Sequence, residues 1–252
     1  MKILLGGALG RMGREVALAA EAAGAEIAAG VDVAYNGQPC AFPVFTGYDQ
    51  ASGDFDVIID FSRPDSLPEL LALATQRQIP AVLCATGYTD QELAMIADAA
   101  KQTPILRSAN MSLGVNVLTE LVSMAARTLE GFDIEIVEKH HRMKADSPSG
   151  TAIMLYDAVK KEKGPETEPV YGRYGRTEKR TGGEIGIHAI RGGTVTGEHE
   201  VGFYGNGEQI LLTHRAENRS LFAQGALKAA FYVQDKPAAL YSMRDVVLQM
   251  LG

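Results

Sequence analysis

The sequence predicts an α/β protein in which a doubly wound parallel sheet is followed by an α+β domain with a mostly antiparallel sheet. Through residue 107, short apolar runs alternate with helical stretches, as in a parallel sheet whose strands are joined by helices. A glycine-rich turn directly follows the first strand. Beyond Asn110, a longer helix and glycine-separated strands replace that alternation. We therefore expect one domain over residues 1–110, with 217–252 packing back on it, and a second over 111–216.

The elements of the first domain follow from its apolar periodicity. Apolar runs with polar ends predict strands over residues 2–5, 26–31, 56–61, 81–85 and 104–107. Alanine- and leucine-rich stretches predict helices over residues 14–23, 68–78 and 90–101. Gly24 then serves as the C-cap of the first helix.

The second domain mixes helices with strands that alternate apolar and polar residues. We expect helices over residues 113–129, 149–160 and 221–233. The stretch 133–139 reads as a half-buried strand, with Ile134, Ile136 and loosely Val137 alternating with Asp133, Glu135 and Glu138. Residues 164–183 are polar and rich in glycine and proline, so we expect a mobile loop. Three antiparallel strands are expected over residues 185–190, 195–203 and 209–215.

Composition excludes several classes of function. A net charge of −7 argues against a general nucleic-acid binder. No stretch approaches the roughly 18 apolar residues of a membrane span, so we expect no membrane partner. The two cysteines, Cys40 and Cys84, lie in unlike contexts and suggest free thiols in a reducing cytoplasm.

The turn after the first strand predicts a dinucleotide site in a Rossmann-like domain. Gly7, Gly10 and Gly13 have the spacing G-x-x-G-x-x-G between a strand and a helix, where glycine lets the backbone approach a pyrophosphate. Asp32 ends the second strand, where a carboxylate can accept hydrogen bonds from ribose hydroxyls. Val33 follows it, so no cation stands beside it for a 2′-phosphate, which favours NADH over NADPH.

A second candidate site lies in the middle of the chain. His140 and His141 are followed by Lys144 and then by Ser-Pro-Ser-Gly-Thr at 147–151, which opens a helix. A helix N-terminus attracts anions, and the imidazoles and lysine supply protons, so the segment suits a small carboxylate substrate that must be protonated. Two other interpretations stay open: a solvated surface pair, or a metal site completed by distant histidines. We expect no metal.

These two motifs resemble one family. Gly-Ala-Leu-Gly-Arg-Met-Gly at 7–13 and Glu-Lys-His-His-Arg-Met-Lys-Ala-Asp-Ser-Pro-Ser-Gly-Thr-Ala at 138–152 are similar to the corresponding motifs of 4-hydroxy-tetrahydrodipicolinate reductases, also called dihydrodipicolinate reductases. The resemblance extends through Asp60-Phe61-Ser62, the segments 85–88 and 108–116, Gly197-Glu198-His199 and Thr213-His214. It covers nearly the whole chain in order.

The resemblance implies an activity, a set of site residues and an assembly. The family reduces a cyclic imine dicarboxylate to tetrahydrodipicolinate with NADH or NADPH, in the diaminopimelate route to lysine. It implies that His140 and Lys144 transfer protons, and that substrate is bound by His141, Gly150 and Thr151. On the cofactor side it implies Gly7, Ala8, Leu9, Gly10, Arg11, Met12, Asp32, Cys84, Ala85, Thr86, Ser108, Ala109, Asn110 and Met111. The family is a homotetramer.

Two alternatives remain at this point. Another two-domain nicotinamide-dependent imine or amino-acid dehydrogenase fits the first 110 residues equally well. A protein that senses NAD(H) without catalysis also fits them, but it needs no imidazoles and lysine beside an anion-binding helix.

Overall fold

The computed structural model describes residues 1–176 and 179–250. The chain divides into two compact units. Unit 1 comprises Met1–Leu113 with Arg219–Gly252, and unit 2 comprises Gly114–Asn218.

Unit 1 is built on sheet A, a parallel sheet of seven strands in the order β12-β6-β5-β4-β1-β2-β3. The strands are β1 (Lys2–Gly6), β2 (Glu26–Val31), β3 (Val44–Phe45), β4 (Val57–Asp60), β5 (Ala81–Leu83), β6 (Ile105–Arg107) and β12 (Leu240–Tyr241). Because β2 and β4 flank β1, the chain winds outward in both directions from the first strand. The sheet is therefore doubly wound, as the alternation of strands and helices predicts.

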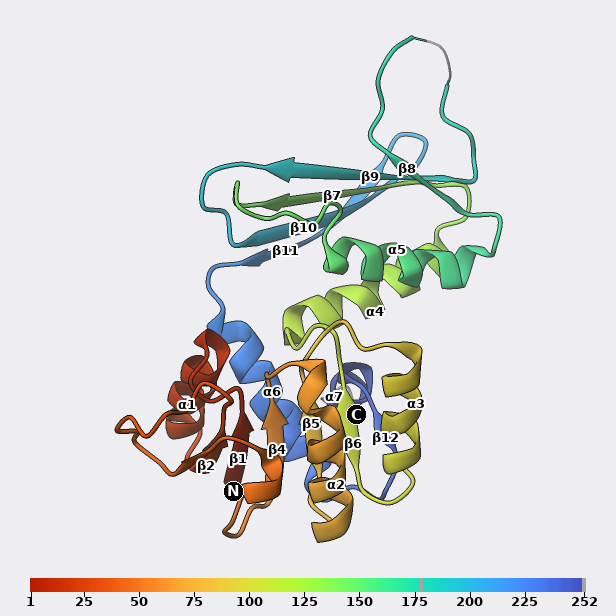
Figure 1. The fold of residues 1–252 in the computed structure, drawn as a ribbon. Helices are drawn as coiled ribbons and strands as arrows, with labels where there is room; N and C mark the ends of the chain where they lie inside the picture. Colours follow the sequence, from red (N-terminus) through yellow and green to blue (C-terminus); the bar gives the residue numbers. More distant parts are fainter. Residues whose placement is uncertain (177–178, 251–252) are drawn as a thin grey trace. The chain divides into compact units, whose positions relative to one another are not determined.

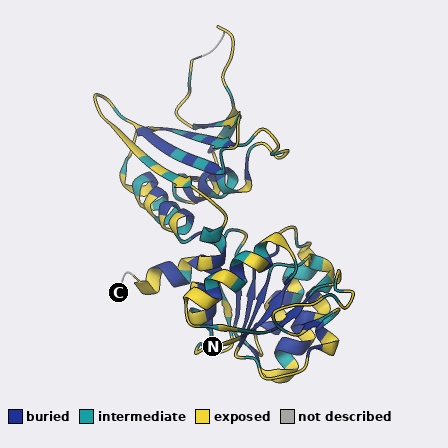
Figure 2. Ribbon diagram, turned by 90° about the vertical axis from the view of Figure 1, so that its left-hand side faces the viewer, coloured by how far each residue is buried: buried dark blue, intermediate teal, exposed yellow. Residues whose placement is uncertain are grey.

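Helices cover both faces of sheet A. One face carries α1 (Arg11–Ala22), α6 (Ser220–Val233) and α7 (Met243–Met250), and the other carries α2 (Leu67–Arg77) and α3 (Asp90–Ala99). Short 3₁₀ turns lie at η1 (Tyr48–Gln50) and η2 (Pro64–Ser66). The strands between the two layers are buried along most of their length, as Figure 2 shows in dark blue.

Unit 2 is built on sheet B, whose strands follow the order β11-β10-β7-β9-β8. These are β7 (Asp133–His140), β8 (Glu168–Tyr171), β9 (Glu184–Arg191), β10 (Gly197–Tyr204) and β11 (Gln209–Ala216). The helices α4 (Leu113–Thr128) and α5 (Gly150–Lys163) pack on one face of the sheet (Figure 1). The core between them contains Leu118, Val122, Leu155, Ile136 and Phe203.

The fold class is confirmed, and four local predictions are wrong. Helix α1 begins at Arg11 and not at residue 14, because Gly13 fits inside its first turn. The expected loop 164–183 contains the edge strand β8, and its residues 177–178 lie outside the described part of the chain. Strand β9 was expected to be antiparallel, but it runs parallel to both of its neighbours, β7 and β8. Glu138 was expected on the polar side of its strand, and it is fully buried.

Candidate active site

In the glycine turn of unit 1, the backbone after β1 passes close to the backbone of Phe61 and to the start of α1. Gly7 has φ +69°, and a Cβ at this position would lie 2.8 Å from the carbonyl oxygen of Phe61. A Cβ at Gly13 would collide with the carbonyl oxygens of Gly7 and Ala8. Helix α1 begins directly after Gly10 with no side-chain cap on its first N–H groups. The N–H groups of the turn itself donate to Val31, Asp32 and Gly7, so the uncapped start of α1, at the positive end of the helix, is what fits the pyrophosphate of a dinucleotide.

Asp32 follows β2 and holds the same turn. Its carboxylate accepts hydrogen bonds from the N–H of Leu9, at 2.9 Å, and from the N–H of Ala34, also at 2.9 Å. Each carboxylate oxygen keeps further acceptor capacity for a hydroxyl group. The position at the end of β2 is the one in which a ribose can be recognised.

The remaining predicted cofactor residues lie at the same edge of sheet A. Residues 84–86 follow β5 and residues 108–111 follow β6, and the carboxyl ends of parallel strands meet at one edge. Cys84 is buried, and burial holds the pKa of its thiol well above the usual value. Met111 is buried in the core with α6, where its carbonyl oxygen lies so close to Gly225 that a Cβ there would collide with it.

Asp60 is a buried acid at this edge, in a segment that carries the family resemblance but for which the sequence predicts no role. Its carboxylate accepts hydrogen bonds from the Tyr48 hydroxyl, at 2.8 Å, and from the Ser62 N–H, at 3.1 Å. Burial raises its pKa, which the hydrogen bonds from Ser62 and Tyr48 counteract. A Cβ at Gly6 would collide with Tyr48 and Asp60, so this network packs against the end of β1.

Unit 2 gathers its polar side chains around Glu138. This residue has no exposed surface, and its carboxylate accepts two hydrogen bonds from the guanidinium of Arg191, each at 2.7 Å. It also contacts Nδ1 of His140 at 2.6 Å and accepts the N–H of Ser149 at 3.0 Å. Burial alone would raise the pKa of Glu138, but Arg191 and His140 outweigh it and the pKa is lowered. A charged carboxylate therefore joins β7, β9 and the start of α5.

The predicted proton-transfer residues lie in and just after β7. His140 is the last residue of β7 and is buried, and it shares a strand face with Glu138 two residues before it. His141 follows and is half-buried. Lys144 lies in the irregular segment after the strand, where its Nζ contacts the carboxylate of Asp146 at 2.8 Å. The segment is held to β9 because Arg191 also donates to the Asp146 carbonyl oxygen at 2.7 Å.

Helix α5 begins at Gly150, and Ser149 is its N-cap. The Ser149 hydroxyl accepts the N–H of Ala152 at 3.2 Å and lies 3.0 Å from Nε2 of His199. Gly150 and Thr151 are the first two residues of the helix and lie at the positive end of its dipole. Pro148 directly precedes the cap.

His199 completes this cluster from β10. Its ring lies edge-on to that of His140, with centroids 5.1 Å apart. Burial and the neighbouring His140 lower the pKa of His199 to about 4, so the ring is neutral at physiological pH. The sequence places His199 in a segment that carries the family resemblance and offers it otherwise as a distant metal ligand, with no role beside His140. Glu138 opens the motif at 138–152, but the sequence assigned it no role in the site, although it lies two residues before His140 and so shares its strand face. Arg191 was not identified from the sequence.

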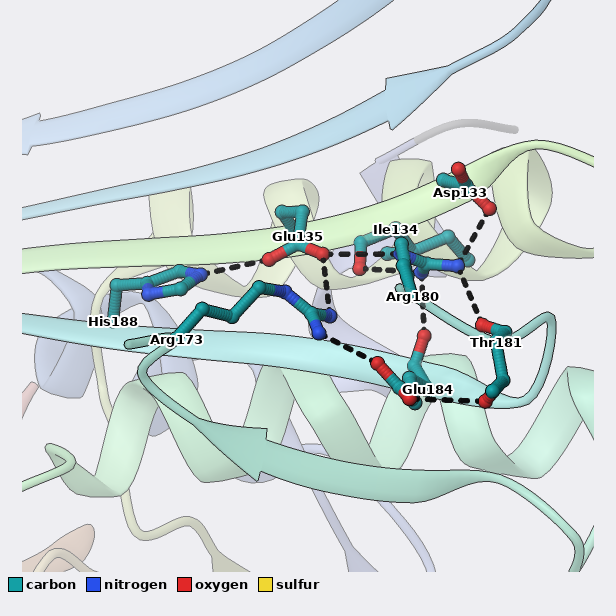
Figure 3. Close-up of polar contacts among 8 residues, drawn as sticks. All are labelled: Asp133, Ile134, Glu135, Arg173, Arg180, Thr181, Glu184 and His188. Carbon is teal, nitrogen blue, oxygen red and sulfur yellow. Dashed lines mark hydrogen bonds and ion pairs between the residues drawn. The ribbon is translucent and has the colours of Figure 1, made fainter. Parts of the chain in front are cut away.

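A second cluster of the same residue types lies on the other face of β7 (Figure 3). Glu135 contacts Nε2 of His188 at 2.7 Å and accepts hydrogen bonds from Arg173 and Arg180. These two arginines come from the segment that the sequence predicts to be a mobile loop. Both are tied to β7 and to Glu184 of β9, so the described part of this segment is anchored to sheet B.

Within residues 1–176 and 179–250, no three His, Cys, Asp or Glu side chains are grouped so that they could hold a metal ion. In the same part of the chain, no helix has the length and apolar character needed to cross a bilayer.

The two units together define a class of protein. The turn of unit 1 fits the pyrophosphate of a dinucleotide, and the cluster of unit 2 fits proton transfer to a carboxylate-bearing substrate. The class is that of the nicotinamide-dependent oxidoreductases. Residues 1–111 match the family model for the N-terminus of dihydrodipicolinate reductase, and residues 114–247 match the model for its C-terminus. The chain belongs to the dihydrodipicolinate reductase family.

Individual relatives agree with this assignment. The chain is 49% identical over 248 residues to 4-hydroxy-tetrahydrodipicolinate reductase of Caldanaerobacter subterraneus subsp. tengcongensis, with 98% of each chain covered. It is 46% identical to the enzyme of that name from Clostridium tetani, covering 96% of this chain and 95% of the relative. The structure of dipicolinate-bound dihydrodipicolinate reductase from Paenisporosarcina sp. TG-14 aligns with a TM-score of 0.83 at 24% identity, covering 97% and 98% of the two chains. That last match supports the fold.

Proposed function

We propose that this chain reduces 4-hydroxy-tetrahydrodipicolinate to tetrahydrodipicolinate with a nicotinamide cofactor, in the diaminopimelate route to lysine. The observation that carries the proposal is the cluster of unit 2. A buried imidazole held by a carboxylate lies beside the N-terminus of α5, in a chain of this family. A cyclic imine dicarboxylate needs both features, because it must be held by its carboxylates and must receive a proton.

In unit 2, some residues bind the substrate and others transfer protons. Gly150 and Thr151 bind a substrate carboxylate at the positive end of α5, and His141 contacts the substrate. His140 exchanges a proton at Nε2, since its Nδ1 is engaged by Glu138. Lys144 donates a proton to the atom on which negative charge develops during reduction, and it must leave Asp146 to do so.

The residues of unit 1 hold the cofactor, which supplies the hydride. The backbone from Gly7 to Met12 binds the pyrophosphate, and Asp32 accepts hydrogen bonds from the adenosine ribose. Residues 84–86 and 108–111 line the nicotinamide side. We propose a preference for NADH, because the exposed Val33 and Ala34 follow Asp32 and neither offers a charge to a 2′-phosphate.

The assembly proposed is a homotetramer built through unit 2. Support comes from the apolar side chains that sheet B exposes, among them Ile190, Ile210 and Leu211. The two free cysteines favour the cytoplasm as its location. Light scattering during size-exclusion chromatography tests the subunit number, and a monomer at micromolar concentration would contradict it.

A coupled assay tests the activity. Aspartate semialdehyde and pyruvate are supplied with a dihydrodipicolinate synthase, and the oxidation of NADH and NADPH is followed separately at about 340 nm, where reduced nicotinamide absorbs. Oxidation that requires this chain supports the proposal, and the two rates test the preference for NADH. A folded protein that binds NADH but oxidises neither cofactor would instead favour a different imine or keto substrate, or a sensor.

A further inference from the structure

We propose that Glu138 is the positioning residue of this site: it fixes the tautomer of His140 and, through the same carboxylate, the start of helix α5. The inference rests on the proposed function, because it concerns how that site is held in working order. None of the sequence motifs assigns a role to Glu138.

The contacts of Glu138 account for both of its oxygens. Oε1 accepts from Arg191 at 2.7 Å and from the Ser149 N–H at 3.0 Å. Oε2 accepts from Arg191 at 2.7 Å and lies 2.6 Å from Nδ1 of His140. With no exposed surface, the carboxylate has no water to replace a lost donor. The carboxylate thus fixes the orientation of the Arg191 guanidinium, the His140 ring and the Ser149 N–H.

The chemistry of a carboxylate determines which nitrogen of His140 carries the proton. An ionised carboxylate only accepts hydrogen bonds, so Nδ1 must be the donor. In neutral His140, therefore, Nε2 is the unprotonated nitrogen, and every proton that His140 exchanges passes through Nε2. Gly197 leaves this atom room, because a Cβ there would lie 3.1 Å from Nε2.

Glu138 also holds the start of α5 and, through Arg191, the segment that carries Lys144. Ser149 is held on both sides, with its N–H on Glu138 and its hydroxyl against His199, so the first turn of α5 cannot shift independently of β7. Arg191 binds Glu138 and the Asp146 carbonyl with the same guanidinium, which connects the segment carrying Lys144 to the same carboxylate. Loss of the charge at residue 138 should therefore affect proton transfer and substrate binding together.

The charges around His140 keep Glu138 ionised near neutral pH. The titratable groups facing the cluster are Arg191 on β9, His199 on β10, His214 on β11 and Lys144 in the segment after β7. His199 and His214 both have lowered pKa values, through burial first, so neither competes as a cation near neutral pH. Arg191 is then the counterion of Glu138.

The test replaces the carboxylate by its neutral isostere in Glu138→Gln. The amide can donate to Nδ1 of His140, which moves the proton of the neutral ring to Nε2 and stops it from accepting there. An analogous carboxylate-to-amide change in a Ser-His-Asp triad lowers kcat by about 10⁴-fold for this reason. The matched control is Glu135→Gln, because Glu135 lies on the opposite face of the same strand and is also paired with a histidine and arginines.

Two readouts are taken on the full-length protein. Ring ¹⁵N spectra of histidine-labelled protein report the tautomer without any substrate, and the chain has only five histidines, so His140→Gln assigns the signal. Steady-state kinetics give kcat, KM for substrate and KM for NADH as a function of pH.

We expect the wild type to carry the neutral-ring proton of His140 on Nδ1. In Glu138→Gln we expect kcat to fall at least about tenfold with a changed pH profile, a raised KM for substrate and an unchanged KM for NADH. In Glu135→Gln we expect the His140 signal and the pH profile of the wild type.

Two results would overturn the proposal: a proton on Nε2 of neutral His140 in the wild type, or a folded Glu138→Gln variant with wild-type kcat and pH profile. If that variant does not fold, the wild-type tautomer alone decides. A wild type inactive in the coupled assay refutes the proposed function and leaves the spectra valid.

Discussion

Replacing Arg191 should lower the free energy of unfolding, because it removes the counterion of the buried Glu138. In Arg191→Met the apolar length of the side chain is largely kept, while Glu138 loses its counterion and two hydrogen bonds of 2.7 Å. Glu138 has no exposed surface, so its charge is left buried and only partly compensated. Breaking a buried ion pair in this way costs about 3–5 kcal/mol. We expect a loss of that size in the free energy of unfolding at pH 8.

The loss should shrink as the pH falls. In the wild type the pKa of Glu138 is lowered, so its charge stabilises the fold above the ordinary glutamate pKa, and this contribution is lost as the pH falls through the lowered value. Without Arg191 the pKa of Glu138 rises. At low pH the carboxylate of the variant therefore takes up a proton, which removes the cost of an uncompensated buried charge. The difference between variant and wild type is therefore smaller at pH 5 than at pH 8.

Urea unfolding followed by far-ultraviolet circular dichroism measures this difference. At about 2–3 kcal/mol per M of urea, the expected loss moves the midpoint of unfolding by about 1–2.5 M. The control is Lys101→Met, which removes an exposed ion pair with Asp98 and should cost less than about 1 kcal/mol. A loss below about 1 kcal/mol for Arg191→Met at pH 8, or an equal loss at both pH values, would refute the reasoning.

Three further predictions concern the other parts of the molecule. Asp32→Ala should weaken NADH binding while circular dichroism and the melting curve stay close to those of the wild type; unchanged binding in a fluorescence titration contradicts the ribose assignment. Gly13→Ala should reduce NADH binding or destabilise unit 1, since its Cβ collides with the carbonyls of Gly7 and Ala8, and a variant identical to the wild type in both titration and melt argues against the close turn. His199 has its pKa lowered to about 4 in the fold, so the unfolded chain binds more protons between pH 6.5 and 4 and stability falls across that range, by up to about 3 kcal/mol. His199→Gln should flatten this dependence in urea unfolding, and an unaltered slope would count against it.

Periodicity was sufficient for most elements of the fold. Most strands of sheet A are apolar runs bounded by turns, so they can be recognised in the sequence. The exceptions are β3 and β12, which have only two residues each. The start of α1 was misjudged because glycine is a poor helix former, whereas Gly13 is needed where the helix packs against the turn. Strand β8 was hidden because an edge strand tolerates proline, and Pro169 lies within it.

The candidate site was predictable in its motif and not in its organisation. His140, Lys144 and the start of α5 are neighbours in sequence, so one segment contains them all. Glu138 was placed with the solvent-facing residues because an unpaired charge is almost never buried. Its counterion, Arg191, is 53 residues away on a strand whose parallel pairing to β7 the glycine turns did not indicate. The ion pair between Glu138 and Arg191 becomes evident only from the register of β7 and β9, in which His140 lies opposite Arg191.

The measurement that tests the central claim most directly is the turnover of Lys144→Ala in the coupled assay, set beside its affinity for NADH. Lys144 lies in unit 2 while the glycine turn lies in unit 1, so proton transfer and cofactor binding should separate. The account predicts a loss of kcat of about 10²-fold or more with little change in NADH affinity. Wild-type turnover in this variant would contradict the assignment of proton transfer to the segment after β7.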